Sequence, residues 1–136
     1  GTIAFNGDFV SKLAPIIERI RKEHGMEIYI LTADTFGTAK AQTSPLPLSL
    51  KVLKSDDHTR EKGEFVKELG QQHVIAMGNG QNDTKMLKEA EISVGIMGRE
   101  GCSTGVLDIA DLVIADIGDA LELLLHPKRL VATLRK

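Results

Sequence analysis

The chain has 136 residues, of which 42% are hydrophobic and 26% are charged, and its formal net charge is −2. This length and balance predict one globular domain spanning residues 1–136, without the basic surface typical of nucleic-acid binding. No segment is long and apolar enough to cross a membrane, and the single cysteine, Cys102, excludes a disulfide framework. We therefore expect a cytoplasmic location, in a reducing compartment.

The apolar residues alternate between helical and strand patterns along the chain. Residues 5–8 read as a loop, and hydrophobic residues then recur at helical spacing until Gly25, a typical helix stop. Further helices are predicted around residues 65–69, 86–90, 121–125 and from Pro127 onward, strands at 27–31, 50–54, 73–77, 92–97 and 112–115, and a proline-containing loop at 43–49. This alternation predicts a three-layer, Rossmann-like α/β fold with a mostly parallel sheet and helices on both faces.

Polar residues follow three of the predicted strands, at the edge where such sheets bind their ligands. A hydroxyl and backbone N–H groups can bind phosphate oxygens, a lysine can neutralise their charge, and carboxylate or amide oxygens can bind magnesium. The residues in question are Thr32 and Ala33 after the first of these strands, Lys62 at the head of the helix after the second, and Asn79, Asn82 and Asp83 after the third.

Each of these residues also has a purely structural interpretation. Asn82 is a good helix N-cap, and Asp83 suits the first turn of a helix. Thr32 could cap a helix after its strand, and Lys62 could lie on a solvated helix face, as most lysines do. The order and spacing of the residues together favour the functional interpretation.

Four segments carry this order: LTAD at 31–34, KGEFVKELG at 62–70, AMGNGQNDTKMLKEAEISVGIMG at 76–98 and ADLVIAD at 110–116. Together they resemble the haloacid dehalogenase superfamily of phosphoryl-transfer enzymes. Within it they resemble the phosphorylation domain of P-type ATPases and the soluble, capless phosphatases related to it. The likeness runs through nearly the whole chain.

The resemblance implies a magnesium-dependent phosphohydrolase that acts on a phosphorylated substrate. In such enzymes an aspartate attacks phosphorus and forms an aspartyl phosphate, which water then hydrolyses. The implied roles are phosphate binding by Thr2, Thr32, Ala33, Lys62 and Asn82, catalysis by Thr32 and Lys62, and magnesium binding by Asn79 and Asp83, with Asp83 also able to pair with Lys62.

The sequence departs from the family pattern at two places. Asn79 stands where an aspartate is usual, so the metal site has one formal charge fewer. Gly1 and Thr2 are interpreted as the end of an Asp-x-x-Gly-Thr motif, which places the nucleophilic aspartate three residues upstream of Gly1. The family's central strand would then also lie upstream, filling a gap between the strands that contain Ile30 and Ile75.

Spacing limits what else the domain contains. Thr2 and Thr32 are 30 positions apart, and Asp34 and Lys62 are 28 apart, so neither a nucleotide-binding domain nor a cap domain fits between them. We expect the open site to be closed by a second subunit in a homo-oligomer or by a partner. The alternatives are a non-catalytic phosphate-binding or regulatory domain, which Asn79 favours, and a fragment of a P-type ATPase.

Overall fold

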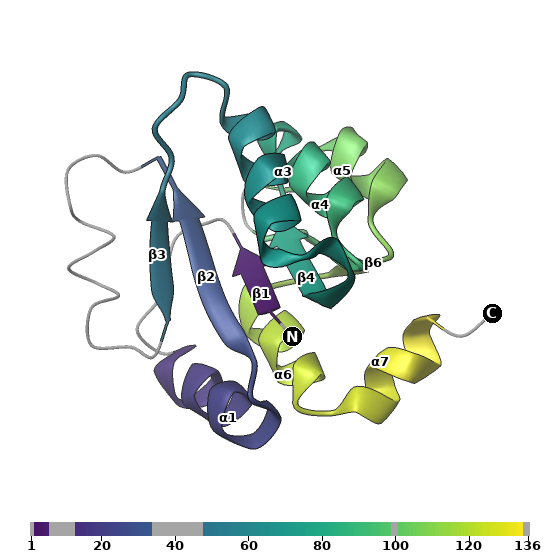
Figure 1. Ribbon diagram of the computed structural model, residues 1–136. Coiled ribbons are helices and arrows are strands. Elements are labelled where there is room, and N and C mark those ends of the chain that lie inside the picture. The colour runs from purple at the N-terminus through teal and green to yellow at the C-terminus, as the bar shows by residue number, and fades with distance from the viewer. Residues whose placement is uncertain (1, 6–12, 34–47, 99–100, 135–136) are drawn as a thin grey trace.

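The computed structural model describes residues 2–5, 13–33, 48–98 and 101–134. Its sheet consists of β1 (Thr2–Phe5), β2 (Glu27–Thr32), β3 (Ser49–Val52), β4 (Val74–Gly78), β5 (Ile92–Ile96) and β6 (Leu112–Ile114). The strands lie in the order β3-β2-β1-β4-β5-β6, and every neighbouring pair is parallel (Figure 1). The predicted parallel α/β sheet is therefore confirmed.

The central strand is not where the sequence prediction placed it. β1 pairs with β2 on one side and β4 on the other, with Ile3 opposite both Ile28 and Ile75. In the described residues β1 occupies this central position, where the sequence analysis expected a strand upstream of Gly1. The four residues of β1 are too few to show a periodic pattern, which is why the sequence did not reveal them as a strand.

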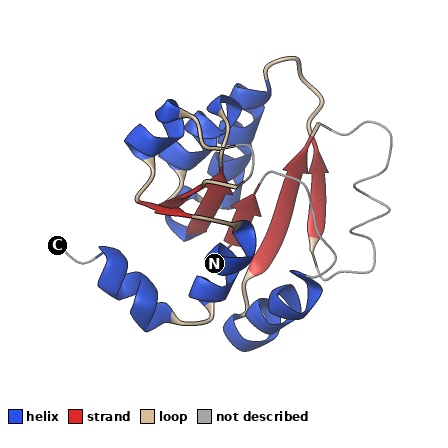
Figure 2. Ribbon diagram, turned by 180° about the vertical axis from the view of Figure 1, so that it is seen from behind, coloured by secondary structure: helices blue, strands red, loops and turns tan. Residues whose placement is uncertain are grey.

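Helices cover both faces of the sheet, which confirms the three-layer arrangement (Figures 1 and 2). One face carries α3 (His58–Leu69), α4 (Thr84–Glu89) and α5 (Thr104–Ile109), and the other carries α1 (Ala14–His24) and α6 (Ile117–Leu124), followed by α7 (Pro127–Leu134). Short 3-10 turns, η2 (Gln71–His73) and η3 (Gln81–Asp83), flank β4. None of the described helices is long and apolar enough to cross a membrane.

Two apolar cores separate these layers, because successive side chains of a strand point to opposite faces. In β4, Val74 and Ala76 pack into the core under α3, α4 and α5, whereas Ile75 and Met77 pack into the core under α1 and α6. A strand that is buried on both faces has to be apolar throughout, and β4 is. This packing on both faces holds β4 in place and therefore sets the position of the turn that follows it.

The helix ends follow the local signals. Gly25 adopts the left-handed conformation at φ 62° and ends α1, with its N–H bonded to the carbonyl oxygen of Arg21. Asp57 caps α3 by accepting a hydrogen bond from the backbone N–H of Arg60 at 3.1 Å. α3 thus begins directly after the loop that leaves β3, which sets the position of its first turn.

Candidate active site at the carboxyl edge of the sheet

The carboxyl ends of β2 and β4 bring two of the predicted groups of residues to the same edge. β2 ends at Thr32 and β4 ends at Gly78, and β1 lies between them. Two strand spacings separate the two ends, which is about 10 Å. A small anionic group can therefore contact both, provided that it sits over the end of β1.

The loop after β3 directs the first turns of α3 toward this edge. The Glu61 carboxylate accepts hydrogen bonds from the backbone N–H groups of Lys54 at 2.9 Å and Ser55 at 2.7 Å. These bonds, that from Ser55 above all, hold the pKa of Glu61 below its usual value. The loop is thereby tied to the helical turn that carries Lys62.

Lys62 is buried and forms an ion pair. Its Nζ donates to Oδ1 of Asp83 at 2.8 Å and to Oδ1 of Asn82 at 3.2 Å, and the side chains of Lys62 and Asp83 are only 1% and 0% exposed. The alternative that Lys62 lies on a solvated helix face is therefore wrong, and the implied pairing of Lys62 with Asp83 is confirmed. Charges this deeply buried are tolerated only when they are paired.

The second oxygen of Asp83 closes the turn after β4. Oδ2 accepts hydrogen bonds from the backbone N–H groups of Asn79 at 3.1 Å and Gly80 at 3.0 Å. A Cβ atom on Gly78 would lie 2.6 Å from Cγ of Asp83, so only glycine fits at the end of β4. Both halves of the Asp83 carboxylate are thus bound by the protein.

The proposed helix-cap role of Asn82 is not what the structure shows, because Asn82 lies inside the 3-10 turn η3. Asp83 does lie in the first turn of η3, where its side chain accepts from the backbone N–H of Gly80, and it makes no cap hydrogen bond to α4. Its oxygens face back toward β4 and across to α3. The asparagine is left exposed beside the buried ion pair.

Sequence reasoning did not find the contact between Asn79 and the start of α5. The Asn79 Nδ2 donates to the carbonyl oxygen of Gly101 at 3.4 Å, and the backbone N–H of Ser103 donates to the carbonyl oxygen of Asn79 at 2.8 Å. Ser103 also caps α5 by accepting from the backbone N–H of Val106. A serine before a short helical pattern indicates where a helix begins, and this was the available signal for the start of α5. It does not indicate which loop the start of that helix contacts.

Cys102 lies in the same segment, half-buried against the core under α3, α4 and α5. Burial raises the pKa of its thiol above the usual value, and the negative charge of Asp83 raises that pKa further. The thiol is therefore neutral at physiological pH and belongs to the packing of this region.

The remaining predicted residues divide between the two edges of the sheet. Thr32 is half-buried at the end of β2, and Ala33 follows it, exposed. Thr2, however, begins β1 opposite Glu27, at the amino edge. Three residues of strand, about 10 Å, separate it from the end of β1. The phosphate-binding role implied for Thr2 stays a prediction, and in this structure Thr2 starts the central strand.

The described residues do not by themselves form the predicted magnesium site. No group of three or more His, Cys, Asp or Glu side chains that could hold a metal ion occurs in the part of the chain that the structure describes. Of the two predicted ligands, Asp83 has both oxygens engaged by the protein and Asn79 offers a neutral amide. The described residues therefore give the metal no preformed set of carboxylates.

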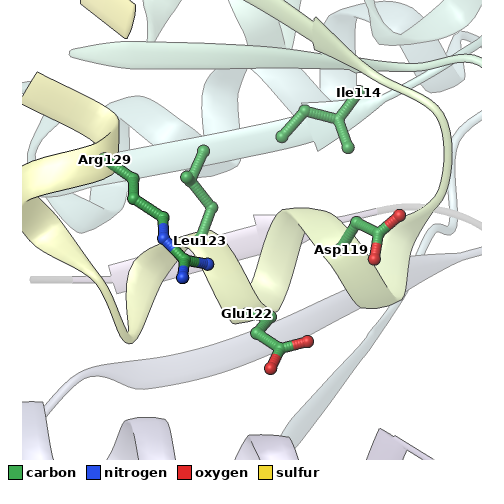
Figure 3. Close-up of a pocket in the computed structure, with 5 residues that line it drawn as sticks. All are labelled: Ile114, Asp119, Glu122, Leu123 and Arg129. Atoms are coloured by element: carbon green, nitrogen blue, oxygen red, sulfur yellow. The ribbon is translucent and has the colours of Figure 1, made fainter. Parts of the chain in front are cut away.

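A separate open hollow of about 300 Å³ lies around α6 (Figure 3). It is lined by Ile114, Asp119, Glu122, Leu123 and Arg129, none of which is a predicted site residue. The pKa of Asp119 is raised above its usual value, chiefly by the charge of Asp116. This hollow belongs to the face of α1 and α6, whereas the ion pair of Lys62 and Asp83 lies between α3 and η3.

Comparison with solved structures supports the same architecture. The crystal structure of 3-deoxy-D-manno-octulosonate 8-phosphate phosphatase from Moraxella catarrhalis, in complex with magnesium, phosphate and KDO, matches with a TM-score of 0.75 at 17% identity, over 98% of this chain and 92% of that chain. The cobalt-bound form of the deoxy-D-mannose-octulosonate 8-phosphate phosphatase from Haemophilus influenzae matches with a TM-score of 0.72 at 9% identity, over 99% of this chain and 92% of that chain. A zinc-transporting P-type ATPase gives 0.71 at 24% identity, over 92% of this chain and 20% of the ATPase.

Sequence comparison identifies the family. An uncharacterized protein from Methanocaldococcus jannaschii is 43% identical over 72 residues, which are 53% of this chain and 77% of that protein. Residues 57–118, which contain Lys62 and the turn after β4, match the model of the haloacid dehalogenase-like hydrolases. With the parallel sheet and the buried ion pair at its carboxyl edge, this match shows that the chain belongs to the haloacid dehalogenase-like hydrolase family.

Proposed function

We propose that the carboxyl edge of the sheet is a phosphate-monoester site and that the chain is a phosphohydrolase. The observation that carries this proposal is the buried ammonium of Lys62, which bonds to Asp83 and Asn82. An ammonium group donates three hydrogen bonds, so these two partners leave one N–H for a ligand. A charge in such a buried position attracts a phosphate oxygen more strongly than a solvated lysine does.

Neighbouring residues supply neutral donors for the same ligand. The Oδ1 of Asn82 accepts from Lys62, so the amide NH₂ of this exposed side chain points away from the lysine. Thr32 and Ala33 contribute a hydroxyl and a backbone N–H from the end of β2. Phosphate oxygens accept from all of these groups.

The family reaction assigns Lys62 a catalytic task. An aspartate oxygen forms a bond to phosphorus as the ester P–O bond breaks, the leaving oxygen gains a proton from an acid, and water then hydrolyses the aspartyl phosphate. Lys62 would offset the negative charge on the phosphoryl oxygens during both steps.

The position of β1 changes where the nucleophile is to be sought. The family motif follows the central strand, and the residues that follow β1 in the sequence are Asn6, Gly7 and Asp8, which lie outside the described residues. Turnover through an aspartyl phosphate would therefore depend on Asp8, the first carboxylate after β1.

Magnesium is part of the expected family reaction, and the phosphatase from Moraxella catarrhalis binds magnesium and phosphate in its crystal structure. In this chain the described donors do not provide a fitting metal site. We therefore assign no catalytic step to a metal ion.

A second candidate function is phosphate binding without turnover. Asn79 favours it, since an amide replaces the carboxylate that is usual at this position. In this case the domain would sense or hold a phosphorylated ligand.

Phosphate release from p-nitrophenyl phosphate, measured with magnesium and with a chelator, separates the two candidates. The phosphohydrolase predicts slow release by the wild type and its loss in Asp8→Asn. Binding without turnover predicts no release by the wild type although inorganic phosphate binds. Circular dichroism of each variant checks that the fold is unchanged.

The ligand is proposed to be a phosphorylated small molecule, and we propose that a second copy of the chain covers the open edge. The described part of the chain contains no cap over the strand ends. Light scattering with and without phosphate tests this closure, because a monomer under both conditions would contradict it.

A further inference from the structure

We infer that Glu61 is a positioning residue of the proposed phosphate site, and the inference rests on that site. The ends of β2 and β4 each supply donors to it, and β1 lies between them. The spacing of the two ends therefore decides whether one phosphate group can bind to both. A series of hydrogen bonds through residues 53–55 and 61–62, here called the bridge, joins these two ends.

The first half of the bridge starts from β2. The backbone N–H of Leu53 donates to the carbonyl oxygen of Thr32 at 2.8 Å, and the Leu53 side chain is buried. The next two backbone N–H groups, those of Lys54 and Ser55, donate to the Glu61 carboxylate at 2.9 and 2.7 Å. Three successive N–H groups of the loop after β3 are thus bound, two of them to a charged acceptor, which makes the stronger kind of hydrogen bond.

The second half of the bridge leads to β4. Lys62 follows Glu61 in the first turns of α3, so their side chains leave the helix about 100° apart. Glu61 faces the loop after β3, whereas Lys62 donates to Asp83 at 2.8 Å. Asp83 in turn accepts from the backbone N–H groups of Asn79 and Gly80 in the turn after β4. α3 is therefore connected to the end of β2 through one residue and to the end of β4 through the next.

The apolar packing of α3 acts at other places. A Cβ atom on Gly63 would lie 3.1 Å from Cβ of Lys85, so α3 lies close against α4, on the side of β4. Phe65 packs against Tyr29 with ring centroids 5.3 Å apart, but Tyr29 lies in the middle of β2. At the carboxyl end of β2 the contact is the half-buried Glu61 carboxylate. Because hydrogen bonds depend on direction, this contact sets the spacing more narrowly than apolar packing does.

Glu61→Ala tests the inference, because it removes the acceptor and leaves the pair of Lys62 and Asp83 in place. We expect it to weaken the binding of inorganic phosphate to the full chain about tenfold, the loss that follows when one hydrogen bond to a charged ligand is misplaced. The measurement is titration calorimetry in a buffer that contains magnesium. Glu61→Gln keeps an oxygen that can accept from both Lys54 and Ser55, so it should recover most of the affinity.

Amide signals in NMR spectra separate positioning from a general loss of structure. In Glu61→Ala the signals of Lys54 and Ser55 should shift, because their N–H groups lose their acceptor. The signals of Asn79 and Gly80, which report the turn after β4, should stay in place. Shifts throughout the spectrum would indicate a purely structural role and would overturn the inference.

Two control variants should bind phosphate within about twofold of wild type. Glu64→Gln removes the same charge from the same helix, at a side chain that is 56% exposed and pairs with Arg60. Ile17→Val lowers stability from the core under α1 and α6, on the other face of the sheet. If Ile17→Val lost as much affinity as Glu61→Ala, the effect would follow stability, and the inference would be wrong.

The remaining outcomes separate this inference from the proposed function. Wild-type affinity in Glu61→Ala overturns the inference and leaves the phosphate site in place. If that variant does not fold, Glu61→Asp replaces it, because its carboxylate is one methylene group shorter. It should bind phosphate more weakly than Glu61→Gln although it keeps the charge, and the reverse order would overturn the inference. An absence of phosphate binding by the wild type overturns the site itself, and the inference with it.

Discussion

The two charged regions of the molecule differ in the way they hold their charges. Lys62 and Asp83 are opposite charges, 1% and 0% exposed, and bonded at 2.8 Å. Around α6, Asp116, Asp119 and Glu122 are like charges that face solvent. The buried pair has no water to replace a lost partner, whereas the exposed carboxylates are screened by solvent and salt. Charge substitutions should therefore have large effects in the first region and small ones in the second.

The largest effect is expected for Lys62→Met, which leaves Asp83 buried without its cation. Loss of one partner of such a pair typically costs about 3–5 kcal/mol in the free energy of unfolding, measurable by urea denaturation. The control is Lys67→Met, because the side chain of Lys67 is 59% exposed and its ammonium lies 3.8 Å from the carboxylate of Glu89. Its cost should stay below about 1 kcal/mol.

The double variant Lys62→Met/Asp83→Asn sharpens this prediction. It removes both charges, so its cost should be smaller than the sum of the two single variants. Additive costs would show that Lys62 and Asp83 do not depend on each other, contrary to the difference drawn between the two regions.

The next largest effect is expected for Gly78→Ala. The added Cβ would lie 2.6 Å from Cγ of Asp83 and would displace the carboxylate from Lys62, at a cost of roughly 1–3 kcal/mol. In Gly80→Ala the nearest atom to the new Cβ is Oδ1 of Asn82 at 3.4 Å, an ordinary contact. In chemical denaturation, the free energy of unfolding of Gly78→Ala should be well below that of Gly80→Ala. Equal free energies would mean that the turn adapts to a side chain at position 78.

Much of the fold could be predicted from the sequence because its signals are local. Gly25 ends α1 as expected, and the apolar run of β4 lies within one residue of its predicted position. β1 could not be found in this way, since four residues at the start of the chain show no period. Only the pairing with β2 and β4 identifies it as a strand, and that pairing joins residues far apart in the sequence.

For the site, the sequence could predict which residues take part but not how they are buried or what they contact. The resemblance placed Lys62 and Asp83 together, and the structure confirms that pair. The burial of the pair depends on the packing of α3 against α4, and the contact of Asn79 with Gly101 joins residues 22 positions apart. The position of Thr2 at the amino edge could not be predicted for the same reason, because it follows from the pairing of β1 with β2.

A smaller effect is expected for Glu61→Gln, which weakens the acceptor for Lys54 and Ser55. Because the pKa of Glu61 is lowered in the folded state, its ionised form stabilises the fold above its unfolded pKa, and this contribution is lost as pH falls through the folded pKa. The variant should be less stable than wild type at neutral pH, and the two should converge between about pH 5 and pH 3. Urea midpoints that stay separated throughout this range would argue against the charged acceptor.

The smallest effect, with the opposite sign, is expected for Asp119→Asn. The pKa of Asp119 is raised, first by the charge of Asp116, so the folded state holds this proton more tightly than the unfolded chain does. The ionised form is therefore unfavourable for folding, and its protonation adds stability as pH falls through the folded pKa. The variant should be slightly more stable than wild type at neutral pH. Its advantage should shrink in acid and in high salt, because both weaken the repulsion between these exposed carboxylates.

The control in thermal denaturation is Asp108→Asn, which replaces an exposed aspartate on α5. A midpoint for Asp119→Asn below that of wild type at neutral pH would show that this carboxylate stabilises α6 despite its neighbours.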